Sequence, residues 1–153
     1  MSLLAGKNIG LFFGSDTGMT EDVAENIVEL WTASELTVID AQHWEVPDFA
    51  EYDILIIGLS TWYDGQLQSD VDEFFEEFKT IDFSGKIVAL YGLGDQYSYG
   101  EYFVDGIGII GKVIMENGGT IVGHWPIDGY EFEESVGQIS DTHFIGLAID
   151  DVC

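Results

Sequence analysis

The fold of this chain is decided by the stretch IGLFFGSDTGMT, residues 9–20. Its first part, Ile9 to Phe13, is a short apolar run typical of a buried strand, and an amphipathic helix is predicted to begin near Thr20. The turn between them, Gly14 to Thr20, is rich in Gly, Ser and Thr. A strand that passes through a short turn into a helix is the opening of a βαβ unit, so the stretch favours an α/β fold.

The turn itself is a candidate anion site. A helix start leaves backbone N–H groups unpaired and carries partial positive charge, and Ser15, Thr17 and Thr20 add hydroxyls. The turn contains no lysine and fits neither the dinucleotide pattern G-x-G-x-x-G nor the P-loop, so a single phosphate monoester is the predicted guest. The same residues are also typical of an ordinary βα turn that caps its own helix.

Apolar runs alternate with helical periods along the whole chain. The predicted strands are Ile9–Phe13, Leu36–Ile39, Ile54–Leu59, Ile87–Tyr91 and Thr120–Val122. The predicted helices carry apolar stripes at Val23, Ile27, Leu30 and Trp31, at Val71, Phe74, Phe75 and Phe78, and at Phe103, Ile107, Ile110 and Ile114. Ser69 with Asp72 resembles a capping box on the second helix, and Gly118-Gly119 is predicted to end the third. We expect residues 1–153 to form one α/β domain, a doubly wound five-stranded parallel sheet with helices on both faces.

The composition narrows the classes of partner. Four Lys or Arg residues against 29 Asp or Glu residues give a formal net charge of -25, which argues against nucleic acid and anionic membranes. A basic protein partner is the natural inference, although such acidity also serves solubility or a saline host. One cysteine, Cys153, makes no internal disulfide, and neither a signal peptide nor an apolar run of membrane-spanning length is visible, so we expect a cytoplasmic protein.

Three predicted loops follow the first, third and fourth strands, and in a parallel sheet such loops gather beyond the carboxyl ends. They are Gly14–Thr20, Ser60–Gln66 and Gly92–Gly100. Trp62 and Tyr99 lie in the second and third of these loops, where an aromatic face suits stacking on a flat ligand.

In order and spacing, from Lys7 onward, these loops resemble those of flavodoxins, which are FMN-binding one-electron carriers. The resemblance implies the strand order 2-1-3-4-5 known for that fold, with FMN at the switch point. It also implies that the phosphate is held by Ser15, Asp16, Thr17, Gly18, Met19 and Thr20. The remaining cofactor-binding positions that it implies are Ser60, Thr61, Trp62, Tyr63, Asp64, Gly65, Gly92, Leu93, Gly94, Asp95 and Tyr99.

Roles carry over from the family to several of these positions. Trp62 matches the aromatic on the inner face of the flavin, Tyr99 the coplanar tyrosine on its outer face, and Asp95 the position at the pyrimidine edge. The stretch 63–65 corresponds to the peptide that flips when the flavin is reduced. The resemblance therefore implies a low-potential carrier that shuttles between oxidised, semiquinone and hydroquinone FMN, with no catalytic side chain and no metal.

The partners implied are basic redox proteins such as ferredoxin–NADP reductase, photosystem I or other ferredoxin-type proteins. The protein itself is expected to be a monomer. Two other functions remain open on the same fold. One is an FMN-dependent NAD(P)H:quinone reductase, and the other is a flavin-free interaction module. Rapid reduction by NADPH alone would favour the first, and a folded protein that stays colourless with added FMN would favour the second.

The end of the chain resembles long-chain flavodoxins only in part. Residues 125–141 resemble the loop inserted in their fifth strand, and Phe144–Ile149 is predicted to resume that strand. The family continues with a last helix, whereas this sequence stops at Cys153. We therefore expect apolar surface to be uncovered, including parts of the strand Ile9–Phe13 and of the stripe at Val23 and Ile27.

Two weaker signals do not change this interpretation. Asp141-Thr142-His143-Phe144-Ile145-Gly146 fits the D-x-H-x-x-G pattern of cobalamin-binding domains, but it comes too late in the chain for that fold. His43, His124 and His143 show no metal-ligand spacing.

Overall fold

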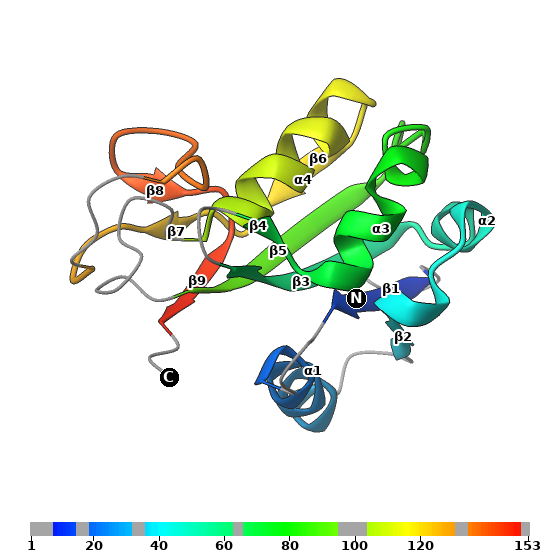
Figure 1. Ribbon diagram of the computed structural model, residues 1–153, viewed down its shortest axis with the longest axis horizontal. Helices are drawn as coiled ribbons and strands as arrows, with labels where there is room; N and C mark the ends of the chain where they lie inside the picture. Colours follow the sequence, from blue (N-terminus) through cyan, green and yellow to red (C-terminus); the bar gives the residue numbers. More distant parts are fainter. Residues whose placement is uncertain are drawn as a thin grey trace, which may run out of the picture.

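A computed structural model describes residues 8–14, 19–31, 36–62, 66–94, 104–130 and 135–150. Its centre is a parallel sheet in which the strands follow the order β2-β1-β3-β5-β6 (Figure 1). The strands are β1 (Ile9–Gly14), β2 (Leu36–Asp40), β3 (Ile54–Trp62), β5 (Ile87–Gly94) and β6 (Thr120–Val122). Counted along the chain, this is the predicted order 2-1-3-4-5, and the predicted fold class is confirmed.

The fifth position of the sheet is shared by two short strands. β6 pairs with residues 87–89 of β5, and β9 (Leu147–Asp150) pairs with residues 91–94 of the same strand. Between them, β7 (Trp125–Pro126) and β8 (His143–Phe144) form an antiparallel pair. The predicted insertion in the fifth strand is therefore confirmed.

The predicted start of the resumed strand is wrong by three residues. Phe144 belongs to β8, where it pairs with Trp125, and its buried ring meets the ring of Tyr130 edge-on at 5.3 Å. The chain then crosses close to β5, since a Cβ on Gly146 would lie 2.3 Å from the Leu90 carbonyl oxygen. β9 begins only after this crossing.

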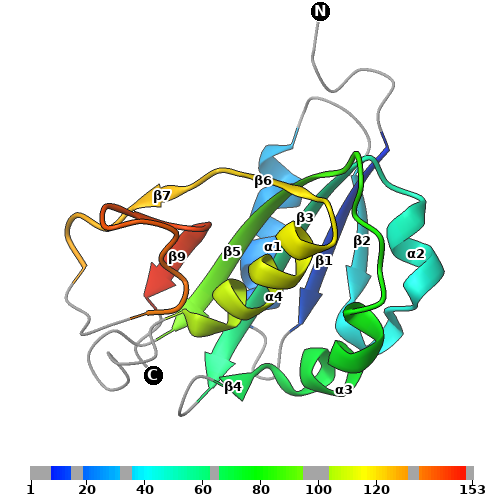
Figure 2. The same cartoon turned by 90° about the horizontal axis from the view of Figure 1, so that it is seen from above.

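One face of the sheet is covered by α3 (Ser69–Phe78), α4 (Asp105–Glu116) and the short α2 (Val46–Ala50), which follows the 3-10 turn η1 (Ala41–His43) (Figure 2). Phe12 of β1 lies at the centre of this core. Its ring stacks on Phe49 at 4.3 Å and meets Trp44 edge-on at 5.8 Å. Trp44 is thus a core residue. The core residues contributed by the helices are Phe49, Val71, Phe74, Phe78, Ile107, Ile110 and Ile114.

On the opposite face, α1 (Met19–Leu30) is the one helix among the described residues (Figure 1). It forms a small cluster with β1 in which Leu11, Phe13 and Ala24 are buried. The prediction that β1 is left uncovered is wrong, because β1 lies between β2 and β3 beneath α1 and all six of its residues are buried. Apolar surface is exposed instead at the other side of this face, where Ile87 and Val122 are each 42% exposed.

Two predicted helix details differ from the structure. Leu30 was placed on the apolar stripe of α1 but is 82% exposed, because the helix turns its Ala24 face to the sheet, and Val23 and Ile27 are half-buried. The cap of α3 is Gln68 rather than Ser69, since the Val71 N–H donates to Gln68 Oε1 at 3.1 Å.

The predicted end of α4 is confirmed, with Gly118 at a φ of 95° just after the helix. No helix in the described parts of the chain is long and apolar enough to cross a bilayer.

Candidate functional site

The carboxyl ends of β1, β3 and β5 lie at one edge of the sheet (Figure 2). The register places Gly14 beside Leu59, and Ser60 beside Leu93. One of the three predicted loops follows each of these strand ends. The topology therefore brings the loops to a common edge, as expected for a ligand site at a switch point.

Part of the predicted site lies within the described residues. Met19, Thr20, Ser60, Thr61, Trp62, Gly92, Leu93 and Gly94 are described, Trp62 by its backbone, which pairs with Gln66 of β4 (Gln66–Leu67). The predicted positions outside the described residues are Ser15, Asp16, Thr17, Gly18, Tyr63, Asp64, Gly65, Asp95 and Tyr99. Their roles stay predictions.

The start of α1 is the predicted phosphate end of the candidate site. Thr20 is in the first helical turn and 1% exposed, whereas Met19 beside it is 41% exposed. Gly14, at the end of β1, leaves room for Gln68, since a Cβ there would lie 2.4 Å from Gln68 Oε1. Strand β1 thus ends directly against the start of α3, and the first turn of α1 opens toward the shared edge.

The end of β3 is tied to the start of α4. The Gly106 N–H donates to Thr61 Oγ1 at 2.8 Å, so the Thr61 hydroxyl accepts a hydrogen bond within the protein. Beside it, the Val136 N–H donates to Asp105 Oδ1 at 2.8 Å, and Asp105 is 6% exposed. These bonds join the end of β3, the start of α4 and the inserted segment.

Backbone strain marks the same junction. Val104, which immediately precedes α4, is fully buried and has a φ of 49°. The left-handed region is costly for a β-branched side chain, and such strain persists only where packing holds it in place. Here α4 packs closely on the insertion, since a Cβ on Gly108 would lie 2.1 Å from the Val136 carbonyl oxygen.

The second and third predicted loops begin later in the chain than the sequence suggested. β5 continues to Gly94 and β3 to Trp62, so residues predicted to open these loops lie in strands. Leu93 is 2% exposed, and a Cβ on Gly92 would lie 2.8 Å from Ile107 Cγ2. Gly92 is therefore required by the packing of α4 on the sheet.

Two of the described lysines, Lys79 and Lys86, are engaged away from this edge. Lys79, just after α3, pairs with Glu76 at 2.9 Å. Lys86, just before β5, donates to the Tyr52 carbonyl at 2.7 Å, at the amino end of the strand. Neither of these two lysines serves an anion at the carboxyl edge, where a helix start offers backbone N–H groups. Within the described ranges, no three metal-ligating side chains cluster.

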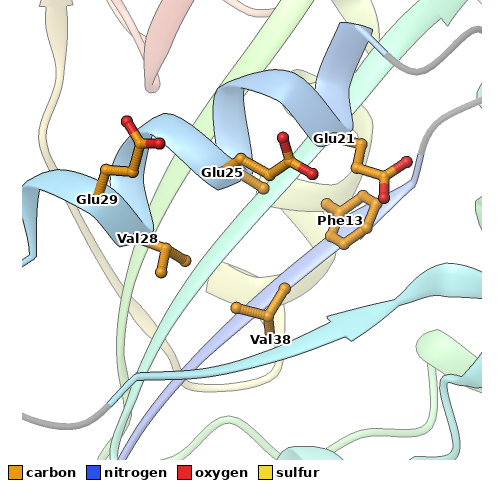
Figure 3. Close-up of a pocket in the computed structure, with 7 residues that line it drawn as sticks. Phe13, Glu21, Glu25, Val28, Glu29 and Val38 are labelled. Carbon is orange, nitrogen blue, oxygen red and sulfur yellow. The ribbon is translucent and has the colours of Figure 1, made fainter.

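A groove of about 380 Å³ runs along the flank of α1 (Figure 3). Glutamates from successive turns of α1 line one side of it, and apolar side chains complete it. The lining residues are Phe13, Glu21, Ala24, Glu25, Val28, Glu29 and Val38. Carboxylates repel a phosphate, so this groove is not the predicted anion site.

Comparison with known proteins identifies the family of this chain. The family model for flavodoxin matches residues 11–151, nearly the whole chain. The chain belongs to the flavodoxin family. Flavodoxin 1 of Escherichia coli K12 is 50% identical over 142 residues, which are 93% of this chain and 81% of that protein. The flavodoxin of Nostoc sp. PCC 7120 is 44% identical over 145 residues, 95% of this chain and 85% of that protein.

A solved structure agrees with these relatives. Fusobacterium nucleatum flavodoxin bound to flavin mononucleotide superimposes with a TM-score of 0.88 at 30% identity, covering 94% of this chain and 85% of that one. Because the similar proteins are flavodoxins, the quinone-reductase alternative is not favoured. Sequence reasoning missed Tyr91 and Asp105, whose hydrogen bonds join residues far apart in the chain. It also missed Gln68, which caps α3 and lies against Gly14.

Proposed function

We propose that this flavodoxin binds FMN at the carboxyl edge of its sheet and works as a one-electron carrier. The observation that carries the proposal is the convergence of the ends of β1, β3 and β5 with the start of α1. Flavodoxins with this fold bind flavin mononucleotide, as the Fusobacterium structure does. When bound, FMN supplies the redox chemistry, and the side chains of the protein position it.

The residues present fit the phosphate of FMN. The first turn of α1 presents backbone N–H groups at the edge, and the turn before it carries hydroxyls at Ser15 and Thr17. The described residues on either side of Ser15 and Thr17, which are Gly14 and Thr20, are both buried. Ser15 to Thr20 would hold the phosphate without a cationic side chain.

The residues of the other two loops fit the ring system. Trp62 and Tyr99 would cover its two faces and Asp95 its polar edge, with Tyr63 to Gly65 beside it. The Thr61–Gly106 hydrogen bond supports this end by joining the end of β3 to α4. The two aromatic faces would exclude water from the ring.

The charge of the protein tunes the cofactor. With a formal net charge of -25, carboxylates oppose the addition of negative charge to the ring. Each carboxylate at ~10 Å raises the energy of an added electron by roughly 0.4 to 1.7 kcal/mol for dielectric constants of 80 to 20. Several such groups would together lower the reduction potential of the bound FMN.

The same acidity favours basic redox partners such as ferredoxin–NADP reductase or photosystem I. The exposed Asp72 and Glu73 lie in the first turns of α3, just after β4 extends the end of β3. Carboxylates placed there would steer a basic partner toward the flavin edge. We propose a monomer in the cytoplasm as the working state.

Calorimetry with FMN and riboflavin tests the proposal, because the two ligands differ only in the phosphate. Wild-type apoprotein should bind one FMN with a clear preference over riboflavin. Thr17→Val removes one phosphate-directed hydroxyl and should weaken FMN binding by about two- to tenfold while riboflavin binding holds. Equal affinities for the two ligands in the wild type would contradict the proposal.

A further inference from the structure

The side chain of Tyr91 lies over the neighbouring strand β3, on the face of the sheet that α1 covers. It lies in β5 and is 2% exposed, and the register places it beside Gly58 of β3. A Cβ on Gly58 would lie only 1.9 Å from Tyr91 Cζ. The aromatic ring therefore lies across the backbone of β3, in the space that the missing side chain of Gly58 leaves.

The hydroxyl of Tyr91 reaches the start of α1. It donates to the carbonyl oxygen of Thr20 at 3.4 Å, joining residues 71 positions apart. Thr20 is itself 1% exposed, so the contact is buried. Burial raises the pKa of the Tyr91 phenol, so the group stays protonated and remains a donor.

This contact bears on the N–H groups of the first turn. The Thr20 carbonyl and the Glu21 N–H belong to one planar peptide unit, so holding the carbonyl also orients the N–H. A donor to the carbonyl polarises that peptide and strengthens its N–H as a donor. On this face the buried cluster around α1 is small, comprising Leu11, Phe13 and Ala24, so one added anchor has a large share in placing the turn.

We propose that Tyr91 is a positioning residue for the phosphate group of FMN. Its hydroxyl holds the first turn of α1 on the sheet, so that the N–H groups of the turn converge on the phosphate. Tyr91 acts through Thr20 and Glu21. This inference rests on the proposed function, and it adds the residue that sets the geometry of the phosphate end.

Tyr91→Phe tests the inference because it removes the hydroxyl and keeps the ring over Gly58. We expect its dissociation constant for FMN to rise by about two- to tenfold, and that for riboflavin to stay within about 1.5-fold of wild type. Tyr130→Phe is the matched control. Tyr130 also donates its hydroxyl to a backbone carbonyl, that of Ala148 in β9. This variant should leave the ratio of the two constants unchanged.

Hydrogen exchange of the apoprotein provides a second measurement that needs no ligand. The Glu21 and Asp22 amides should exchange several-fold faster in Tyr91→Phe than in wild type, while amides of α3 keep their rates. The inference is overturned if Tyr91→Phe weakens both ligands equally or neither, or if these amides exchange as in wild type. If wild-type protein shows no preference for FMN over riboflavin, the proposed phosphate site fails, and Tyr91 has no phosphate to position.

Discussion

The two faces of the sheet are covered in different ways. On one face, α2, α3 and α4 bury a continuous core in which Phe12, Phe49 and Phe78 are fully inaccessible. On the other face, α1 and the ring of Tyr91 cover β1 and β3, while Ile87 and Val122 stay 42% exposed. The first face supplies most of the apolar burial, and the second carries the helix start proposed to hold the phosphate. Stability and phosphate binding should therefore respond to substitutions on different faces.

The largest effect is expected at the centre of the core that α2, α3 and α4 cover. Phe49→Ala removes a fully buried ring that stacks on Phe12 and meets Trp44 edge-on, and it should lower the free energy of unfolding by about 3–5 kcal/mol in urea titrations. Leu30→Ala on α1 is the control, since Leu30 is 82% exposed and the change should stay within about 0.5 kcal/mol. Similar losses for the two variants would show that the faces do not differ.

The second largest effect is expected from a methyl group at Gly58, on the face of the sheet that α1 and Tyr91 cover. Gly58→Ala places a Cβ 1.9 Å from the Tyr91 ring, which must move, at a cost of about 1–3 kcal/mol in the free energy of unfolding. FMN binding should weaken more than riboflavin binding, because the displaced ring takes the hydroxyl from Thr20. In the Tyr91→Ala background, Gly58→Ala should cost much less. The full cost in both backgrounds would mean that the ring does not occupy this space.

The junction of β3 and α4 should behave differently from the phosphate end. Thr61→Val deprives the Gly106 N–H of its acceptor and should cost about 1 kcal/mol in the free energy of unfolding. Because this junction supports the ring end of the site, FMN and riboflavin should lose affinity by the same factor in calorimetry. Thr61→Ser, which keeps the hydroxyl, should restore both affinities. A loss confined to FMN would place Thr61 at the phosphate instead.

The smallest effect is expected at the exposed apolar residues on the α1 face of the sheet. Val122→Thr changes a side chain that is 42% exposed and should shift the free energy of unfolding by no more than about 0.5 kcal/mol. Its neighbour Ile121 belongs to the core covered by α2, α3 and α4 and is 9% exposed. Ile121→Val should therefore lower the free energy of unfolding by about 0.5–1.5 kcal/mol. Thermal melts of both variants check the pair. A larger loss at Val122 would mean that this surface is covered in the folded protein.

Errors in the sequence analysis also differ between the faces. The stripes of α3 and α4 were predicted correctly at Phe74, Phe78 and Ile110, because these helices face a broad apolar surface and their period follows it. On α1 the stripe failed at Leu30, since a helix with few neighbours need not bury every apolar residue. Ser69 was wrong as the cap because the helix begins at Ser69 itself, so the side chain of the preceding Gln68 accepts from the Val71 N–H.

The sequence by itself determined the alternation of strands and helices and the three loops at the carboxyl edge, because local period and turn chemistry are written in consecutive residues. The order of the strands was implied by the resemblance to flavodoxins, and the structure has that order. It also indicated the insertion that divides β6 from β9. Only the tertiary structure decided that Tyr91 meets Thr20, that Thr61 holds Gly106 and that Asp105 binds the backbone at Val136. These contacts join residues 31 to 71 positions apart, and a side chain finds such a partner only once the sheet has brought the segments together.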